Sequence, residues 1–482
     1  MMRDRELMIY RGFPDHRDGL LHRMALLMDA YEEGAMGQEG PGAERDAMGG
    51  GHSMERMHAM EGKRSVEEWH AVEERNSREM FYGCIHSLLE LAGTYGFHGN
   101  LWHCYLTHLL VIHENSYSRG CEMRGGLEGT VNQAVLHDME IFKEFFDYDF
   151  APMCALMGME AFSMIERYEG SALESRVYNA RICERICELA AKLGEAATPA
   201  EMKGTLTGFY QEYGVGKFGL HKSFRIVGGG AGPDAEARIE PILNIAHVKL
   251  DDLVGYEQQK KKLRDNTEAF VSGRKANNCL LFGDAGTGKS SCIKAIANEY
   301  YHRGLRVIEV YKHQFQDLNS VISQIKSRNY RFIIFMDDLS FEDFEIEYKY
   351  LKAVIEGGLE KKPENVLIYA TSNRRHLIRE NYGDKTEDGH LPEIRQDMHT
   401  SDTVQEKLSL VYRFGVTIYF GAPDKKRFQE IVGALADRQG IGMPREELLA
   451  EANKWELSHG GLSGRTAQQF IDYILGMRNW NK

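Results

Sequence analysis

One stretch of the sequence, GDAGTGKS, combines glycines, a lysine and a serine at a spacing that suits phosphate binding. It fits the pattern G-x-x-x-x-G-K-[ST] and stands between a strand-like and a helix-like segment, which is the context that this pattern requires. Glycines let backbone N–H groups turn toward phosphate oxygens, and a helix N-terminus adds the positive end of its dipole. The lysine can reach the β- and γ-phosphates and the serine can bind Mg²⁺, so we predict a site for ATP and Mg²⁺. The predicted nucleotide ligands here are Gly283, Asp284, Ala285, Gly286, Thr287, Gly288, Lys289, Ser290 and Ser291.

Two aspartates follow a short apolar run further along the chain, in FIIFMDD. Such a run is typical of an interior strand of a parallel sheet, and these sheets carry their chemistry at the carboxyl ends of the strands. We therefore predict that Asp337 holds Mg²⁺ together with Ser290, mostly through a bound water. Asp338 then falls where a carboxylate can activate the attacking water as a general base. Taken alone, the stretch also fits a buried strand that leads into a solvated acidic turn.

Three more polar side chains extend the predicted catalytic site. Asn373 ends the apolar run VLIYATSN and can orient the attacking water, although a capping turn would explain it equally well. Arg413, in EKLSLVYRFG, is expected near a helix end, where it can stabilise phosphoryl charge in a neighbouring subunit or simply pair with the helix dipole. Arg465 follows Ser463, the expected N-cap of a late helix, and can fold back onto the γ-phosphate.

These side chains need a scaffold, and from about residue 245 the pattern alternates strands with helices, as in an α/β domain. After residue 424 the pattern is helical again, with Asp424 as a good N-cap. The expected strands are 279–282, 306–310, 332–336, 366–371 and 416–419.

The first part of the chain is mainly helical in pattern between residues 65 and 213. One of these helices is expected to stop at Gly194 and carries Cys183 and Cys187. Their four-residue spacing favours a shared buried face over a metal or redox pair. Three histidines, spaced five apart around a helix, do not face one ion and are treated as ordinary helix residues: His103, His108 and His113.

Two glycine-rich segments divide the chain. Residues 34–63 lack an apolar period and predict a disordered tract, with soft-metal binding by its Met and His residues as the less favoured alternative. The run VGGGAG at 227–232 predicts a hinge. The expected organisation is a mostly helical accessory or recognition domain at 1–226, a linker at 227–244, an α/β core at 245–422 and a helical region at 423–482.

Bulk composition excludes some classes of protein. The chain has 482 residues and a net charge of −13, so it has no global electrostatic footprint for nucleic acid. Its apolar runs are far shorter than the roughly 20 residues of a membrane helix, so no membrane contact is expected. The N-terminal MMRDRELMIYRGF lacks the apolar core of a signal peptide, and the eight cysteines form no CxxC pair. We therefore expect reduced thiols and a cytoplasmic location.

The order of the motifs resembles that of the AAA+ ATPases. LVGYEQQKKKL, GDAGTGKS, FIIFMDD, ATSN, YRFG and GLSGR resemble box II, Walker A, Walker B, sensor 1, the arginine finger and sensor 2, over about residues 245–482. The stretches MDDLSFE, VIEGGLEKKPENVLIYATSNRRHLIRE and EKLSLVYRFG are similar to DUF815, a bacterial family of unknown function. In the N-terminal part, HENSYSRGCE and HDMEIFKEFF are also similar to that family.

The resemblance implies an α/β fold with an AAA+ P-loop core. The core would be a five-stranded parallel sheet of order 5-1-4-3-2, preceded by the mostly α-helical N-terminal domain and followed by a helical lid at 423–482. Nucleotide would bind between core and lid. The residues expected near adenine are Val254, Gly255 and Tyr256.

Asp338 departs from the wider superfamily, in which Glu is usual at this position. The Asp side chain is shorter by one methylene, on the order of 1.5 Å, which a backbone shift or a bridging water can recover. Glu342 is a weaker candidate to take over the role. Because a DD pair is usual in the closer family, the resemblance implies a working but slow ATPase.

Three functions remain open at this point. An oligomeric ATPase, in a ring or spiral, would remodel or load a macromolecular partner, and a trans-acting Arg413 favours it because such an arginine needs a subunit interface. A nucleotide-gated switch or loader with little hydrolysis fits Asp338 and the long N-terminal domain. A P-loop kinase fits least, since the lid and Arg465 argue against it and no acceptor pocket is evident.

By this reasoning, the expected partner is a protein client of unknown identity. Tyr311 and Phe315 lie where remodelling relatives carry pore loops, an inference from position alone. Nucleic-acid contact is possible but not indicated, because a basic cluster after the ATSN motif more often pairs with the acidic stretch EIEYKYLKAVIEGGLE. The cluster consists of Arg374, Arg375, His376 and Arg379.

Overall fold

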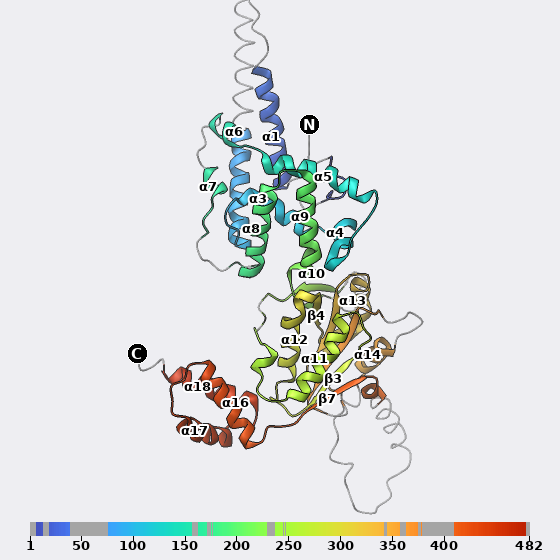
Figure 1. The fold of residues 1–482 in the computed structure, drawn as a ribbon, viewed down its shortest axis with the longest axis vertical. Helices are drawn as coiled ribbons and strands as arrows, with labels where there is room; N and C mark the ends of the chain where they lie inside the picture. Colours follow the sequence, from blue (N-terminus) through green and yellow to red (C-terminus); the bar gives the residue numbers. More distant parts are fainter. Residues whose placement is uncertain are drawn as a thin grey trace, which may run out of the picture. The chain divides into compact units, whose positions relative to one another are not determined.

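The chain forms two compact units, Met1–Leu220 and His221–Lys482, each with its own hydrophobic core (Figure 1). The predicted boundary lay at residue 226, so the second unit begins earlier than expected. The computed structural model describes residues 6–12, 19–38, 76–156, 162–170, 175, 177–228, 237–243, 245, 247–341, 345–356, 363–374, 377 and 409–478.

The N-terminal unit is helical, and side chains cap several of its helices. Asn100, Asn179 and Thr198 each accept a hydrogen bond from a backbone N–H in the first turn of the helix that follows. Residues 76–95 are helical as well. The named elements are α1 (Leu20–Gln38), α3 (Leu101–Ile112), α4 (Ser116–Cys121), η2 (Glu122–Arg124), α5 (Val131–Asp147), α6 (Ala151–Leu156), α7 (Ser163–Glu166), α8 (Ala180–Glu195), α9 (Pro199–Glu212) and α10 (Gly216–Leu220).

Helices α3, α5, α8 and α9 pack against one another around an aromatic core. Trp102 of α3 is buried, and its indole N–H donates to the carbonyl oxygen of Phe145 on α5 at 2.8 Å. Helix α8 ends at Glu195, one residue beyond Gly194, so the predicted helix end is correct to within one residue. A Cβ at Gly194 would lie 2.7 Å from His103 Nδ1, and close packing of α8 on α3 therefore explains the glycine.

The predicted disordered tract at 34–63 also needs correction at its start. Helix α1 continues to Gln38, so residues 34–38 are helical. The remainder of the tract, 39–63, lies outside the described residues.

The C-terminal unit contains a seven-stranded sheet in the order β2-β1-β4-β5-β6-β3-β7. All neighbouring strands in it are parallel except β1 and β2. Strand β6 is buried along its whole length, as expected for a central strand covered on both faces. The strands are β1 (Ser223–Val227), β2 (Arg238–Pro241), β3 (Cys279–Gly283), β4 (Leu305–Glu309), β5 (Arg331–Met336), β6 (Val366–Ser372) and β7 (Val416–Phe420).

The register of the sheet aligns the carboxyl ends of the strands that lead to the predicted site residues. Phe282 at the end of β3 pairs with Ser372 at the end of β6, and Met336 at the end of β5 pairs with Ala370 of β6. The residues that follow β3, β5 and β6 therefore lie close together, although they are far apart in sequence.

Helices cover the sheet, and a second group of helices follows it. Buried side chains of α11 and α12, such as Leu263 and Ile293, share a core with the strands. The helices and 3₁₀ turns of the sheet region are η3 (Leu250–Asp252), α11 (Glu257–Val271), α12 (Lys289–Tyr300), η4 (Tyr301–Arg303), η5 (Lys312–Asp317), α13 (Leu318–Ile325) and α14 (Glu347–Glu356). The last group, red in Figure 1, is α16 (Lys425–Arg438), α17 (Arg445–Ser458) and α18 (Gly464–Arg478).

The last three helices have a small apolar core of their own, which includes Phe428 and Phe470. Asp424 caps α16 as predicted, because its carboxylate accepts a hydrogen bond from the N–H of Arg427 at 2.7 Å. Ser463 accepts from the N–H of Thr466 at 3.0 Å at the start of α18. Among the described helices, none has the length and apolar character needed to cross a membrane.

All five expected strands are present, with bounds within one residue of those predicted. Numbered among themselves, these five parallel strands run 5-1-4-3-2 across the sheet. The sheet nevertheless has seven strands, and the expectation of five is wrong for this chain. Strands β1 and β2 extend it beside β4, and β2 lies inside the segment 227–244 that was predicted as a linker.

Candidate nucleotide site

The GDAGTGKS stretch, here called the phosphate loop (Gly283–Ser290), forms the turn between β3 and α12. Gly283 has a φ of +131°, and a Cβ there would lie 2.1 Å from the carbonyl oxygen of Phe420 on β7. Gly286 has a φ of +73°, and a Cβ there would lie 2.9 Å from the hydroxyl of Ser463. The carbonyl oxygen of Gly286 also accepts from the N–H of Arg465 at 3.3 Å. The loop therefore contacts both the sheet and the last helix, and only glycine fits these approaches.

Lys289 begins α12, and its ammonium group is buried against the loop. Its Nζ donates to the carbonyl oxygens of Gly283 at 2.9 Å and Asp284 at 2.6 Å, and to the side-chain oxygen of Asn373 at 3.0 Å. Burial lowers the pKa of Lys289, and nearby carboxylates, Asp284 first among them, act in the opposite direction. A phosphate oxygen would replace neutral acceptors by a charged one, which makes a stronger hydrogen bond.

Asp337 lies at the end of β5, where two hydroxyl groups bind one of its oxygens. Ser290 Oγ from α12 and Thr371 Oγ1 from β6 both donate to Asp337 Oδ1 at 2.5 Å. Hydroxyl and carboxylate oxygens are the ligands that Mg²⁺ prefers, so Ser290 and Asp337 fit the predicted cation. The position of Thr371 in this arrangement was not predicted.

Asp338 follows with a φ of +50°, a left-handed conformation that Asp tolerates better than most residues. Its N–H donates to Thr371 Oγ1 at 2.9 Å, and its carboxylate accepts from Asn373 Nδ2 at 2.7 Å. The Thr371 hydroxyl therefore connects the two acids, and the residues predicted as general base and water-orienting amide lie together. Glu342, the alternative base, lies outside the described residues.

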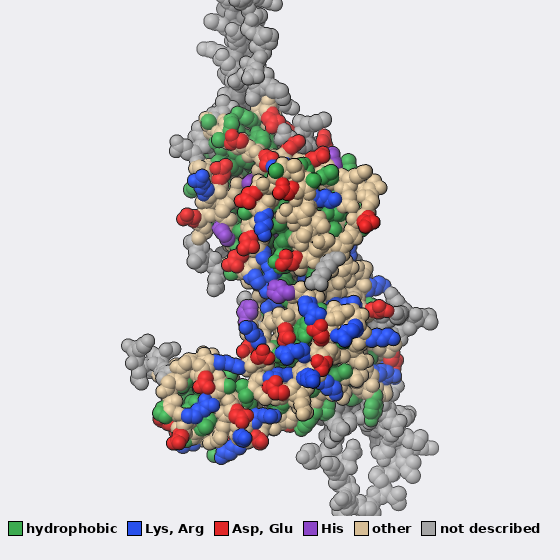
Figure 2. All heavy atoms as spheres, in the orientation of Figure 1, with side chains coloured by type: hydrophobic (Ala, Val, Ile, Leu, Met, Phe, Trp, Pro, Cys, Tyr) green, Lys and Arg blue, Asp and Glu red, His purple; other side chains and the backbone are tan. Residues whose placement is uncertain are grey.

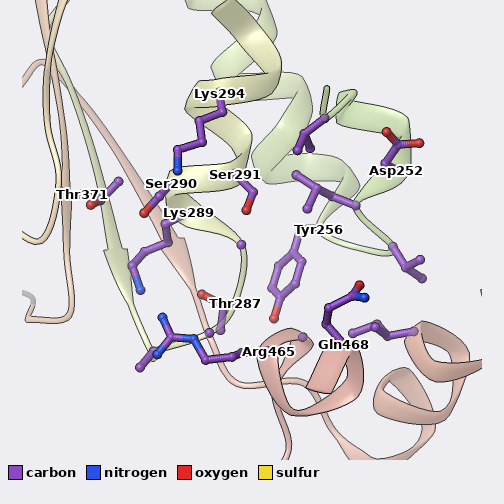
Figure 3. Close-up of a pocket in the computed structure, with 18 of the residues that line it drawn as sticks. Asp252, Tyr256, Thr287, Lys289, Ser290, Ser291, Lys294, Thr371, Arg465 and Gln468 are labelled. Carbon is purple, nitrogen blue, oxygen red and sulfur yellow. The ribbon is translucent and has the colours of Figure 1, made fainter. Parts of the chain in front are cut away.

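These side chains line a cavity of about 910 Å³. Its walls also include side chains of α16 and α18 and a segment before α11, namely His247, Val248, Asp252, Leu253, Val254 and Tyr256. Figure 3 shows Lys289 of α12 and Arg465 of α18 reaching the same region of the cavity, with Tyr256 nearby. The predicted residues in the wall are Val254, Tyr256, Ala285, Gly286, Thr287, Gly288, Lys289, Ser290, Ser291, Asp337, Asp338, Asn373 and Arg465.

The segment before α11 joins the sheet to the C-terminal helices on the side predicted for adenine. The Tyr256 hydroxyl donates to the carbonyl oxygen of Gly421 at 2.7 Å. The guanidinium carbon of Arg427, on α16, lies 5.6 Å from the centre of the Tyr256 ring. Val254 packs against the apolar core of α16–α18. This wall therefore depends on contacts between residues 254–256 and the C-terminal helices.

Three of the predicted nucleotide ligands are not part of the cavity wall, as far as the described residues define it. Asp284 accepts from the N–H of Ala422 at 2.6 Å and so holds the loop to the segment after β7. Gly283 lies against β7, and Gly255 lies in the turn before α11 with a φ of +80°. These three residues shape the loop, whereas their neighbours face the cavity.

Arg413 is placed differently from the other predicted catalytic residues. Its guanidinium donates to the hydroxyl of Ser409 at 2.9 Å and forms an ion pair with Glu356 at the end of α14. Among the described residues of this chain, Arg413 is not part of the cavity wall. A role for Arg413 in a neighbouring subunit therefore stays a prediction, and it would require this ion pair to open.

Two basic residues of the cavity wall were missed in the sequence. Arg438 of α16 donates to the carbonyl oxygens of Asp252 at 2.5 Å and Asp251 at 3.2 Å, which ties α16 to the start of the domain. Arg438 also forms an ion pair with the Asp252 carboxylate at 3.9 Å, but no short sequence spacing marks this contact between residues far apart in the chain. Lys294 lies one turn beyond Ser290 on the same face of α12, and that four-residue spacing was the available signal (Figure 3).

Of the two aromatic residues considered for contact with a partner, one is exposed and the other is buried. Phe315 is 2% exposed and packs near Phe341, so the pore-loop interpretation fails for it, whereas Tyr311 is 47% exposed. On the face drawn in Figure 2, basic and acidic side chains are mixed over both units. Of the basic cluster, Arg374 is described, and its N–H donates to the Ser372 hydroxyl. The others lie outside the described residues: Arg375, His376 and Arg379.

The phosphate loop, the acids at the end of β5 and the strand order define a P-loop domain of the AAA+ class. Within that class, the chain belongs to the DUF815 family. The family model, described as "Protein of unknown function (DUF815)", matches residues 231–478. The match includes every residue of the cavity wall.

Short segments are similar to curated proteins of this class. The chain is 34% identical over 80 residues to the replication factor C large subunit of Staphylothermus marinus, covering 16% of this chain and 18% of that protein. It is 28% identical over 109 residues to the chaperone protein ClpB of Rickettsia conorii, covering 19% of this chain and 12% of that protein. The chain thus spans less than a fifth of the length of these relatives.

Matches to solved structures have lower sequence identity. The FIGL-1 AAA domain in complex with ADP has 18% sequence identity and a TM-score of 0.33, covering 49% of this chain and 76% of that chain. The Thermotoga maritima RuvB Holliday junction branch migration motor has 15% identity and a TM-score of 0.29, covering 47% of this chain and 71% of that chain.

Proposed function

We propose that this chain binds Mg-ATP in the 910 Å³ cavity, hydrolyses it slowly, and uses the nucleotide cycle to remodel or load a macromolecular partner. One observation carries the proposal, a continuous series of hydrogen bonds from the phosphate loop to Asp338, the proposed general base, and to Asn373. The series joins Ser290, Asp337, Thr371, Asp338 and Asn373. Such an arrangement would hold the proposed cation ligand, general base and water-orienting amide in fixed relative positions.

Binding would rest on the loop and on two cations from different elements. The N–H groups at the start of α12 would surround the phosphates, and Lys289 would exchange its carbonyl acceptors for phosphate oxygens. Arg465 would add a positive charge from α18, so that nucleotide links the C-terminal helices to the sheet. Mg²⁺, held by Ser290 and Asp337, would neutralise charge on the phosphate oxygens.

Hydrolysis would depend on Asp338. Its carboxylate can take a proton from a water that attacks the γ-phosphate, and Asn373 Nδ2, 2.7 Å away, would hold the carboxylate and the water in line. The shorter Asp side chain leaves a longer gap to that water than Glu would. A low turnover is therefore expected.

Assembly would complete the site. In the proposed ring or spiral of identical chains, Arg413 would reach the cavity of the adjacent chain and stabilise phosphoryl charge. For that, its ion pair with Glu356 must open. The partner is expected to be a protein client, since neither the net charge of −13 nor the mixed charge of the face in Figure 2 indicates nucleic acid.

A nucleotide-gated switch with little hydrolysis is the second candidate. The observation that favours it is the same Arg413–Glu356 ion pair, because it holds the arginine within its own chain. In such a switch ATP would bind tightly and turnover would stay very low at all protein concentrations. A P-loop kinase gains no support from the cavity, whose polar wall residues serve phosphates and the cation.

The experiment compares ATP turnover of wild type, Arg413→Ala and Glu356→Gln over a range of protein concentrations. The oligomeric ATPase predicts a rate per chain that rises with concentration. It also predicts a loss on the order of 10³-fold for Arg413→Ala, and an equal or higher rate for Glu356→Gln, which frees the arginine. If the ion pair is only structural, both substitutions lower the rate alike.

A mixing test addresses the shared site directly. Arg413→Ala and Lys289→Ala are each expected to be inactive, but a mixed oligomer joins an intact arginine to an intact phosphate loop. Turnover should therefore return across a range of mixing ratios. Absence of any recovery, in samples where mixed oligomers are shown to form, contradicts the shared site and leaves the switch.

A further inference from the structure

Three metal-ligating side chains of the N-terminal unit lie close together, and a fourth adjoins one of them. His98 precedes α3, Cys104 lies on α3, and Cys183 and Cys187 lie on α8. His98 Nδ1 and the sulfurs of Cys183 and Cys187 all lie within 4.8 Å of one another. Cys187 Sγ is also 3.8 Å from Cys104 Sγ, so a fourth ligand adjoins the other three.

Two of the distances in this cluster match edges of a zinc tetrahedron. With Zn–S about 2.3 Å and Zn–N about 2.0–2.1 Å, tetrahedral angles place two sulfurs about 3.8 Å apart and a sulfur and a nitrogen about 3.6 Å apart. The structure has 3.8 Å between Cys187 Sγ and Cys104 Sγ, and 3.6 Å between Cys187 Sγ and His98 Nδ1. A disulfide would need roughly 2.05 Å between the sulfurs. The spacing therefore suits a shared ion better than a covalent bond.

We propose that His98, Cys104, Cys183 and Cys187 bind one Zn²⁺ ion. The ligands would be the neutral imidazole through Nδ1 and three thiolates, a set that is typical of structural zinc sites. Each thiol would form a sulfur–zinc bond and release its proton to solvent, with no change of oxidation state.

Two of the thiols donate hydrogen bonds to backbone carbonyl oxygens. Cys183 Sγ donates to the carbonyl oxygen of Gly96 at 2.6 Å, and Cys104 Sγ donates to the carbonyl oxygen of His98 at 3.3 Å. Both acceptors belong to the loop 96–98 that carries the histidine. Zinc binding would replace these two bonds by a common centre that joins the same loop to α3 and α8.

The surrounding backbone holds the four ligands in place. Cys183 and Cys187 are one turn apart on α8, so their side chains share a face. The residue after His98, Gly99, exchanges two backbone hydrogen bonds of 2.9 Å with Tyr168. Asn100 then caps α3 through the N–H of His103. The loop that carries His98 is therefore fixed on its C-terminal side, next to the ligand.

The pattern of burial also suits an ion that enters from solvent. Cys104 and Cys183 are buried, Cys187 is half-buried and His98 is exposed. Simple apolar packing of cysteines explains the first two but gives no reason for an exposed imidazole nitrogen beside the sulfurs. The sequence alone predicted only a shared buried face for Cys183 and Cys187, since the other two ligands arrive through the fold.

The first measurement is metal content of the full-length protein, purified without chelators from zinc-supplemented cells. We expect about one zinc per chain, as a single four-ligand site requires. Cys187→Ala removes the ligand at which both measured edges meet and should abolish stoichiometric zinc. Cys154→Ala, a buried thiol of the same unit outside the cluster, is the matched control and should retain it.

A second measurement guards against misfolding of the cysteine variant. His98→Gln changes an exposed side chain and should lower zinc affinity at least about tenfold, whereas His86→Gln, also exposed, should not change it. Adding Co²⁺ to chelator-treated wild type should give thiolate-to-cobalt absorption and the visible bands of tetrahedral cobalt. Zinc-free wild type without this cobalt spectrum, unchanged zinc affinity in His98→Gln, or a Cys104–Cys187 disulfide in freshly purified protein would each overturn the proposal.

Discussion

Replacing Thr371 by valine should disturb both acids of the nucleotide site at once. Thr371 is 1% exposed, and its Oγ1 donates to Asp337 Oδ1 at 2.5 Å while it accepts from the N–H of Asp338 at 2.9 Å. Valine keeps the shape of the side chain and removes both hydrogen bonds. The change therefore tests whether this hydroxyl positions the acids.

The size of the effect follows from the two bonds that are lost. A hydrogen bond to a charged group contributes about 1.5–3 kcal/mol and a neutral one about 0.5–1.5 kcal/mol. Asp337 and Asp338 are exposed, so water can replace part of this loss. We expect the free energy of unfolding to fall by about 1–2 kcal/mol. A displaced Asp338 should lower ATP turnover about tenfold, equivalent to roughly 1.4 kcal/mol in the activation barrier.

The assay combines urea unfolding with steady-state ATP turnover at several Mg²⁺ concentrations. Thr371→Ser is the matched control, because serine keeps the hydroxyl and loses only the methyl group. We expect the serine variant to stay close to wild type in turnover and the valine variant to need more Mg²⁺. If the two variants unfold and turn over alike, the hydroxyl does not position the acids and the reasoning is refuted.

Three further predictions follow from single residues. Asp338→Asn should bind ATP like wild type and turn over about 10²- to 10⁴-fold more slowly in a steady-state assay, and a wild-type rate would show that the base lies elsewhere. Gly283→Ala should lower the free energy of unfolding by at least about 3 kcal/mol, because the new Cβ would lie 2.1 Å from the Phe420 carbonyl oxygen at a φ of +131°; an unchanged melting temperature would contradict this. Burial lowers the pKa of His108 from 6.5 to about 4, so the unfolded chain binds more protons in that range and the free energy of unfolding should fall as the pH drops from about 6.5 toward 4. Chemical denaturation at pH 7 and pH 5 measures this change, and equal stability at both values would count against it.

The sequence predicted those features that local pattern determines. The five central strands are continuous apolar runs, and their bounds were predicted to within one residue. The phosphate loop could be recognised because its glycines, lysine and serine occur within one turn between a strand and a helix. Strands β1 and β2 were missed because charged residues interrupt their apolar pattern, Arg225 in β1 and Arg238 and Glu240 in β2.

Features that depend on neighbours across the fold could not be predicted. Thr371 reaches Asp337 because Met336 pairs with Ala370 between β5 and β6, and no sequence spacing encodes that register. Arg438 binds two backbone carbonyl oxygens and the Asp252 carboxylate, which lie far away in the chain and at no recognisable spacing. Likewise, the four-residue spacing on α8 predicted that Cys183 and Cys187 share a face. His98 and Cys104 join them only because the fold brings α3 and the loop before it against α8.

The most direct test of the account is an equilibrium titration of ATP, with Mg²⁺, into wild type and Lys289→Ala. The Lys289 ammonium is held by the carbonyl oxygens of Gly283 and Asp284, at the point where the account places the β- and γ-phosphates. Wild type should bind about one ATP per chain, and Lys289→Ala should bind at least about 100-fold more weakly, a loss of roughly 2.7 kcal/mol. Circular dichroism would show that the variant is folded. Equal affinity in both proteins, or no binding by wild type, would contradict the assignment of this cavity as an ATP site.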